Sequence, residues 1–260
     1  KQLTRLKSRV VYETIRQEGE SELRRPQSAI WWSGIAAGAA ISLSLMVEAM
    51  FRSYLPDAPW RPIVENLGYT SGFLLVMLSR MQLFTENTIT TVLPMLAQPC
   101  RRTMLGTARL WGIVFIANMV GTFLAALLIA YGGILTPEVS ATTVELSHHV
   151  AAWSASDTFV KAIPAGFLIA AIVWMLPSAE GSEFWVIVFF TYIIALGDMA
   201  HVVVGSAELF LLAVIGEENI FKLVTVNLLP ALLGNVLGGT GLFAMLAWGQ
   251  VSHEMSEENK

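Results

Sequence analysis

The sequence predicts an all-α membrane protein with six transmembrane helices, of which the second and the fifth are broken. Hydrophobic residues make up 55% of the 260 residues and charged residues only 14%, and the mean hydropathy is +0.61. Soluble domains carry about 25% charged residues. Several apolar stretches approach the ~20 residues that a helix needs to cross a bilayer. The single cysteine, Cys100, excludes an intrachain disulfide and a cysteine metal cluster.

The six crossings follow from the lengths of the apolar stretches. The first, third, fourth and sixth are continuous apolar runs, whereas the second and fifth are too long for one straight crossing and are interrupted by polar residues and glycine. Lipid offers backbone groups no hydrogen-bond partner, so every crossing must be helical or locally buried. We place the crossings at 28–51, 66–97, 109–132, 158–177, 184–215 and 222–249.

Basic residues predict the orientation. They crowd the first 27 residues and recur at Arg101, Arg102 and Arg109, whereas the 132–157 loop has neither Lys nor Arg. Basic loops stay in the cytoplasm. The first 27 residues are polar, so we expect no cleaved signal peptide. We therefore expect a bacterial-type inner (plasma) membrane protein, in which a cytoplasmic N-terminal segment (1–27) and a cytoplasmic tail (251–260) flank a six-helix domain (28–250).

The segment 3–17 has the spacing of an amphipathic helix on the cytoplasmic face. Leu3, Leu6, Val10 and Ile15 would then face inward. A solvated charged tail is the equally weighted alternative.

An internal repeat relates the two halves of the chain. Asn118-x-x-Gly121 in the third crossing matches Asn235-x-x-Gly238 in the sixth, "GIAAGAAISLSLM" in the first matches "AIPAGFLIAAIVWM" in the fourth, and the broken crossings then correspond. Three crossings per copy place the second copy upside down, which is the inverted-repeat architecture with solute sites near the midplane. Small residues at Gly34-x-x-x-Gly38 and Gly234-x-x-x-Gly238 fit close helix packing, although glycine is also simply common in membrane helices.

Ionisable residues fall inside the broken crossings. Each costs about 2.5–3.5 kcal/mol near the bilayer centre, so we expect them to face each other or a water-filled path. Arg80 could instead pair with a carboxylate, Glu86 or Glu208, to brace the two broken helices. His201 could change charge near neutral pH, and the helix breaks expose N–H groups that attract anions. These residues are Arg80, Glu86, Asp198, His201 and Glu208.

Glu48 and Arg52 lie four residues apart near one end of the first crossing. This spacing predicts a structural ion pair on one helix face.

Three motifs resemble the formate/nitrite transporter family, over roughly residues 28 to 250. "LFTENT" (83–88) resembles the loop that breaks its second helix, "LGDMAHVVVGSAELF" (196–210) its broken fifth helix, and "NLLPALLGNVLGG" (227–239) its sixth. The F-T-E-N-T and H-x-V-x-G-S-x-E motifs together look like the YfdC-like branch.

The resemblance implies a homopentamer of aquaporin-like protomers, each with its own pore. It implies that Thr85 and His201 lie at the pore centre, and that Leu83 and Phe84 line apolar constrictions beside it. Two departures stand out. An ungapped alignment on "AELF" puts Val204 at the family's histidine position, and Arg80, Glu86 and Glu208 add charge to the pore.

The predicted function is a passive or proton-linked pore for small monovalent anions such as formate, nitrite, acetate or hydrosulfide. The alternatives are a conduit for a neutral solute or a cation, and a non-conducting scaffold or sensor. An intramembrane protease is disfavoured because Ser71 in "GYTSG" has the wrong spacing for a G-x-S-G nucleophile. We expect no enzyme activity, no cofactor, no metal and no nucleic acid, and membrane lipid and further copies of the chain as partners.

Overall fold

The computed structural model describes residues 6–257, with side chains up to residue 252, and within that range every regular element is helical. Four helical runs are long and apolar enough to cross a membrane: Gln27–Tyr54, Arg101–Tyr131, Ala155–Ser178 and Ile220–Ser252. They coincide with the first, third, fourth and sixth expected crossings. The first run is built from α2 (Gln27–Ile41) and α3 (Leu43–Tyr54), the second is α7 (Arg101–Tyr131), and the third contains α9 (Ala155–Met175).

The two remaining apolar stretches are interrupted. In the first, α4 (Arg61–Leu78) ends five residues before α5 (Phe84–Thr90), which leads into α6 (Val92–Ala97). In the second, α10 (Glu183–Leu196) ends five residues before α11 (Val202–Ile215). We call residues 79–83 the first break and residues 197–201 the second break.

The last run is one helix with irregular turns. It contains α12 (Ile220–Lys222), α13 (Leu229–Val236) and α14 (Met245–Glu257), joined by π-helical turns at Leu223–Leu228 and Leu237–Ala244. The helix therefore passes the boundary expected at residue 250, and most of the expected tail is helical.

The segment 132–157, which the sequence indicated as a loop, contains α8 (Pro137–Ala151). Thr136 caps this helix by accepting a hydrogen bond from the Val139 amide at 3.4 Å. Its buried face consists of Val139, Thr143, Ser147 and Ala151, spaced four residues apart. Because that face is small and half polar, it lacks the apolar stripe that usually reveals a helix.

α1 (Ser8–Arg24) is a docked amphipathic helix, so the alternative of a solvated tail is wrong. Its buried face differs from the expected one: Ile15 is buried, but Leu6 and Val10 are exposed. Leu3 lies outside the described residues. Tyr12 and Val11 are buried in their place, and the Tyr12 hydroxyl donates to the Leu93 carbonyl in α6 at 3.4 Å.

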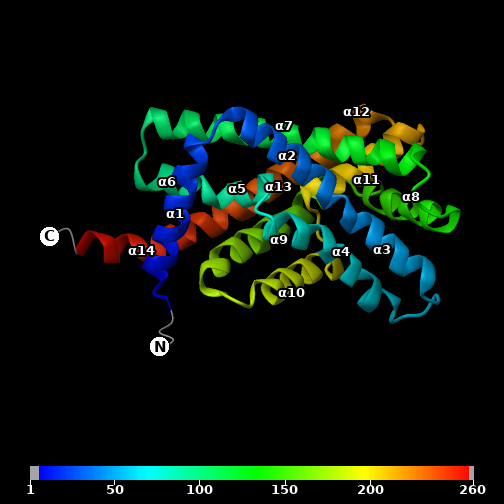
Figure 1. The fold of residues 1–260 in the computed structure, drawn as a ribbon, viewed down its shortest axis with the longest axis horizontal. Helices are drawn as coiled ribbons and strands as arrows, with labels where there is room; N and C mark the ends of the chain where they lie inside the picture. Colours follow the sequence, from blue (N-terminus) through cyan, green and yellow to red (C-terminus); the bar gives the residue numbers. More distant parts are fainter. Residues whose placement is uncertain (1–5, 258–260) are drawn as a thin grey trace.

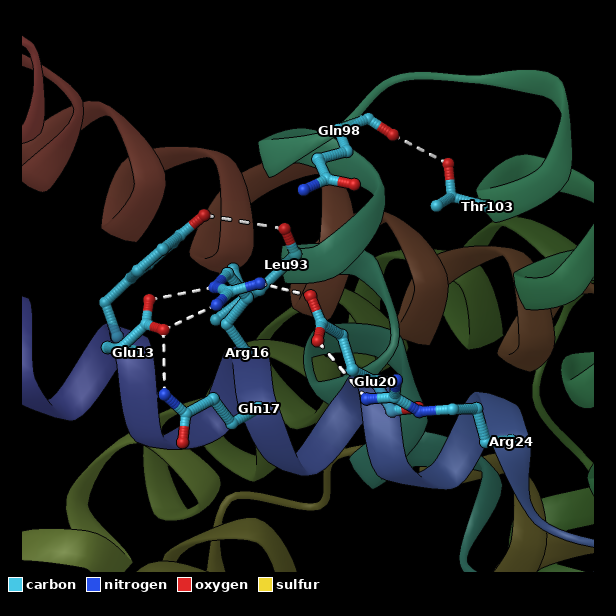
Figure 2. A network of polar contacts seen from close by, with 9 residues as sticks. Glu13, Arg16, Gln17, Glu20, Arg24, Leu93, Gln98 and Thr103 are labelled. Atoms are coloured by element: carbon cyan, nitrogen blue, oxygen red, sulfur yellow. Dashed lines mark hydrogen bonds and ion pairs between the residues drawn. The ribbon is translucent and has the colours of Figure 1, made fainter.

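The other face of α1 has a ladder of ion pairs, which Figure 2 shows running from Glu13 through Arg16 and Glu20 to Arg24. The Arg16 guanidinium donates to Glu13 and holds the pKa of that carboxyl below its usual value. Such pairs at i,i+3 and i,i+4 spacing support the helix by a few tenths of a kcal/mol each.

The molecule has two ends with different helices. α1, α6 and α14 gather at one end of the long axis, and α3, α8 and α12 gather at the other (Figure 1). The broken helices meet between these ends, where α5, α11 and α13 contact one another. The region where the broken helices meet therefore lies between the α1 end and the α8 end of the molecule.

Glycines let the long helices touch. A Cβ on Gly121 in α7 would lie 2.2 Å from the Ile35 carbonyl oxygen, and one on Gly238 would lie 2.0 Å from the Ile163 carbonyl oxygen. Added atoms at Gly38 and Gly234 would likewise come within 2.5 Å of a backbone oxygen on the facing helix. These positions therefore need glycine for close packing.

Candidate pore site between the two broken helices

The two breaks have the same backbone conformation. Arg80 has φ +53° and Asp198 has φ +52°, and they are the only described residues other than glycine with a positive φ. The next residues are also alike, since the Met81 amide donates to the Val76 carbonyl and the Met199 amide to the Ile194 carbonyl, each at 3.0 Å. At each break the backbone therefore leaves a helix and changes direction through one left-handed residue.

Asn118 in α7 holds the first break. Its Nδ2 donates to the carbonyls of Gly34 and Gln82, each at 2.8 Å, and its Oδ1 accepts from the Phe84 amide at 2.9 Å. Phe84 opens α5, so this bond satisfies an amide that has no partner within the helix.

Asn235 in α13 holds the second break in the same way. Its Nδ2 donates to the carbonyls of Ala162 at 2.8 Å and Ala200 at 2.9 Å, and its Oδ1 accepts from the Val202 amide at 2.8 Å. Both asparagines are fully buried. The matched Asn-x-x-Gly motifs thus contact equivalent backbone atoms in the two halves of the chain.

The second break contacts α5 through a hydrogen bond between His201 and Thr85. Thr85 Oγ1 lies 2.8 Å from His201 Nε2, and both side chains are buried. The Val204 amide donates to His201 Nδ1 at 3.3 Å, so Nδ1 is an acceptor. The geometry assigns the proton to Nε2, which donates to Thr85, and the ring is neutral.

His201 is the N-cap of α11 and Val204 lies in its first turn, and His201 is the residue that brings an imidazole to Thr85. Val204 is buried without a polar side chain. The Phe73 ring contacts the imidazole edge-on, with ring centroids 4.9 Å apart.

The two apolar residues of the "LFT" motif point to different places. Leu83 is buried and lines a cavity that opens toward α1. Phe84 packs instead against the rings of Trp111 and Phe115 in α7, at centroid distances of 5.6 and 5.2 Å. Leu83 is therefore the member of the pair that faces the cavity.

The cavity toward α1, here the α1-side cavity, contains the first break. Arg80 forms an ion pair with Glu18 of α1, and its side chain is 77% exposed. It is not the buried partner of Glu86 or Glu208, because the break turns it outward to α1. Glu86 also lines this cavity, and its Oε1 is buried without a hydrogen-bond partner.

A chain of side-chain bonds connects α1 with α5 across the same cavity. Gln82 Nε2 donates to Glu22 Oε2 at 2.8 Å, and Asn87 Nδ2 donates to Gln82 Oε1 at 3.1 Å. The N-terminal helix therefore forms part of the cavity wall.

The cavity toward α8, here the α8-side cavity, contains the second break. Asp198 accepts from Lys161 Nζ at 2.5 Å and lies 2.9 Å from His149 Nε2. The Lys161 ammonium also lies 4.6 Å from the ring centroid of Trp153. The lining includes Glu48, Asn66, Tyr69, His149, Trp153, Asp198, His201, Glu208 and Asn227.

The expected Glu48–Arg52 pair is wrong. Arg52 donates to Glu65 in α4 at 2.9 Å and to Glu145 in α8 at 2.6 Å. Arg52 lies one turn nearer the helix end and reaches neighbouring helices, while Glu48 lines the α8-side cavity.

Sequence reasoning missed Lys161. It is the only Lys or Arg within 158–177, which the sequence predicts as a continuous apolar crossing. The cost of a membrane charge that singled out Arg80 applies equally to Lys161. Glu48 is also absent from the predicted pore residues, because its spacing from Arg52 predicts a structural ion pair.

Comparisons with known proteins agree on one family. The family model described as formate/nitrite transporter matches residues 9–249. The inner membrane protein YfdC of Escherichia coli (strain K12) is 41% identical, over 98% of this chain and 83% of that protein. The nitrite transporter NirC of Salmonella typhimurium is 25% identical, over 84% of this chain and 81% of that protein.

Solved structures share the fold. A channel titled FNT family ion channel superposes with a TM-score of 0.81 at 21% identity, over 92% of this chain and 98% of that one. A pentameric formate channel with formate bound gives a TM-score of 0.71 at 17% identity, over 85% and 96% of the two chains.

Proposed function

Because the chain belongs to the formate/nitrite transporter family, we propose that it is a membrane channel or transporter for small monovalent anions of weak acids. Relatives are named a formate channel in Bacillus thuringiensis and a nitrite transporter in Salmonella typhimurium. Formate-, nitrite- and acetate-like anions are the proposed substrates, and the proposed activity is transport rather than catalysis.

The proposed architecture has six crossings in residues 28–250, arranged as two inverted three-helix repeats like those of aquaporins. The equivalent bonds of Asn118 and Asn235 support it, because an unrelated pair of helices has no reason to repeat three contacts. We propose a homopentamer with one pore per protomer, by analogy with the pentameric formate channel.

The proposed orientation places α1, and with it the α1-side cavity, in the cytoplasm of a bacterial-type cell. The basic residues of the N-terminal segment and Arg101, Arg102 and Arg109 support it. The α8-side cavity then faces the outside of an inner membrane, which is the membrane named for the E. coli relative. Lipid covers the exposed apolar residues of α2, α7 and α10 that do not contact another protomer.

The hydrogen bond between Thr85 and His201 is the observation that carries the pore proposal. It joins α5, directly after the first break, to the second break at a buried point, with Leu83 on the α1-side cavity and His201 on the α8-side cavity. An anion would lose water on passing the apolar residues and regain hydrogen bonds at this polar pair.

The tautomer of His201 determines which hydrogen-bond donor the Thr85–His201 pair presents to an anion. Nδ1 is occupied by the Val204 amide, so the ring donates through Nε2 without a positive charge. Because that bond fills Thr85 Oγ1 as an acceptor, the Thr85 hydroxyl hydrogen is directed to another acceptor. The pair therefore presents a neutral donor, which suits an anion that passes without a charged histidine.

The test is anion flux into liposomes that contain the purified protein. We expect formate, nitrite or acetate to enter faster than into empty liposomes between pH 5 and 8. Thr85→Val and His201→Leu should each reduce the flux at least tenfold. Ser71→Ala serves as the matched control, because the Ser71 hydroxyl donates only to backbone carbonyls of its own and a neighbouring helix.

Two outcomes would replace the proposal. Swelling with uncharged solutes but no anion flux would indicate the neutral-solute conduit. No flux of any solute, with intact oligomers, would indicate a non-conducting scaffold or sensor.

A further inference from the structure

The α8-side cavity contains oxygen acceptors that have no donors. Glu48 on α3 and Glu208 on α11 both line it, and Glu208 is only 8% exposed. Within the part of the chain that the structure describes, neither carboxylate has a hydrogen bond or an ion pair. Glu48 is half-buried. A buried carboxylate normally has a charged or hydrogen-bonding partner, and the described residues supply none for Glu208.

Asn227 is a third, independent acceptor on the wall of the same cavity. Its Nδ2 donates to the carbonyls of Val150 and Trp153, at 3.2 and 3.3 Å. These two acceptors fix which end of the amide is nitrogen. The oxygen therefore points the other way, and it is buried without a partner in a residue that is 1% exposed.

The described basic side chains near the cavity already form ion pairs with other carboxylates. Lys161 binds Asp198, which also contacts His149, and Arg52 binds Glu65 and Glu145. No described cation therefore forms an ion pair with Glu48 or Glu208. An anion approaching from this side would meet two carboxylates, which opposes its entry.

We propose that the α8-side cavity binds a small monovalent cation between Glu48 and Glu208, with the Asn227 amide oxygen as a neutral ligand. Carboxylate and amide oxygens are the ligands that hard cations prefer, and an ammonium ion would donate N–H bonds to the same atoms. The accessible volume of the cavity is about 80 Å³, which suits a small ion with a few waters.

A divalent metal ion fits the cavity less well. In the described residues no group of three or more His, Cys, Asp or Glu side chains is placed to hold a metal ion. The two carboxylates could balance one or two positive charges. Together with the Asn227 oxygen, however, they supply fewer oxygen ligands than the six to eight that calcium takes.

The consequence for transport rests on the proposed function. A cation bound at this site neutralises the entrance that Glu48 and Glu208 make acidic. Anion passage should then depend on which cation is present on that side of the membrane.

The test is a binding measurement that does not depend on transport. The thermal unfolding midpoint of the full-length oligomer in detergent is measured as choline chloride is replaced by sodium or ammonium chloride at constant ionic strength. A bound cation raises the midpoint in a saturable way. A response to sodium alone identifies a metal-ion site, and a response to ammonium alone identifies an ammonium site.

Variants locate the site. Glu48→Gln and Glu208→Gln should each abolish the shift, whereas Glu180→Gln, in the exposed turn between α9 and α10, should retain it. Glu208→Asp keeps the charge but shortens the reach, and should move the half-saturating concentration at least threefold even if Glu208→Gln does not fold. A missing shift in the wild type, or an equal shift in Glu208→Asp and Glu208→Gln, overturns the proposal.

Flux measurements separate this inference from the proposed function. A saturable shift without anion flux leaves the cation site standing and rejects the channel. Anion flux that is equal in choline, sodium and ammonium, together with no shift, rejects the cation site and leaves the channel standing.

Discussion

The two breaks are alike in backbone and different in side chains. Each reverses through a left-handed residue, Arg80 or Asp198, and each is held by three hydrogen bonds from one asparagine. The residue just before the anchored amide is Leu83 in the first break and His201 in the second. The same backbone bonds hold both breaks, and the different side chains give the two cavities different chemistry.

The largest expected effect tests the shared frame. Asn118→Leu removes the hydrogen-bond partner of the buried Phe84 amide and Gln82 carbonyl, and Asn235→Leu removes that of the Val202 amide and Ala200 carbonyl. At about 1–3 kcal/mol for each unpaired group, each substitution should cost several kcal/mol and lower the unfolding midpoint steeply. Thermal unfolding of the purified oligomer in detergent measures both.

The control for these substitutions is Gln250→Leu, whose exposed amide donates only to Ser8. If Asn118→Leu unfolds the protein while Asn235→Leu is harmless, the breaks are not equivalent and the proposed repeat loses its main support.

A second comparison uses the glycines behind each asparagine. Gly121→Ala and Gly238→Ala place a methyl group about 2 Å from a backbone carbonyl oxygen of the facing helix. Backbone cannot yield as a side chain does, so each should cost about 1–3 kcal/mol. Gly112→Ala, in the same helix as Gly121, meets nothing within 4 Å and should be neutral or slightly stabilising.

The unfolding midpoints of Gly121→Ala, Gly238→Ala and Gly112→Ala measure how tightly each glycine packs against its neighbouring helix. Equal losses at Gly112 and Gly121 would mean that the α2–α7 contact is looser than described.

Local patterns in the sequence were sufficient to predict the long helices. The apolar runs have the length of a crossing, and polar residues with glycine mark both interruptions. α8 was not predicted because its buried face is made of small and hydroxyl side chains, whose pattern differs little from that of a polar loop.

The polar contacts depend on tertiary distances that one sequence does not contain. Arg80 binds Glu18, which is 62 residues away on a helix whose docking face was only partly predicted. The Thr85–His201 pairing was implied by the family resemblance, whereas the neutral tautomer follows from the Val204 amide, a contact visible only in three dimensions.

The smallest expected effect concerns the two left-handed residues themselves. Arg80→Gly and Asp198→Gly make the same backbone change at nearly the same φ, so relief of left-handed strain and the added freedom of the unfolded chain nearly cancel between them. The difference in their unfolding free energies therefore reports the side-chain contacts. Arg80 has an exposed pair with Glu18, which is worth about 0–1 kcal/mol, whereas Asp198 holds both Lys161 and His149.

We therefore expect Arg80→Gly to be close to neutral and Asp198→Gly to be less stable than Arg80→Gly by about 1 kcal/mol, the scale of a partly exposed charged pair. In a double-mutant cycle, Asp198→Gly should cost much less in a Lys161→Met background than in the wild type, because the Lys161–Asp198 ion pair is already lost. An equal loss in both glycine variants would contradict this expectation. It would mean that the Arg80–Glu18 contact fixes α1 over the α1-side cavity as firmly as the Lys161–Asp198 contact fixes the second break.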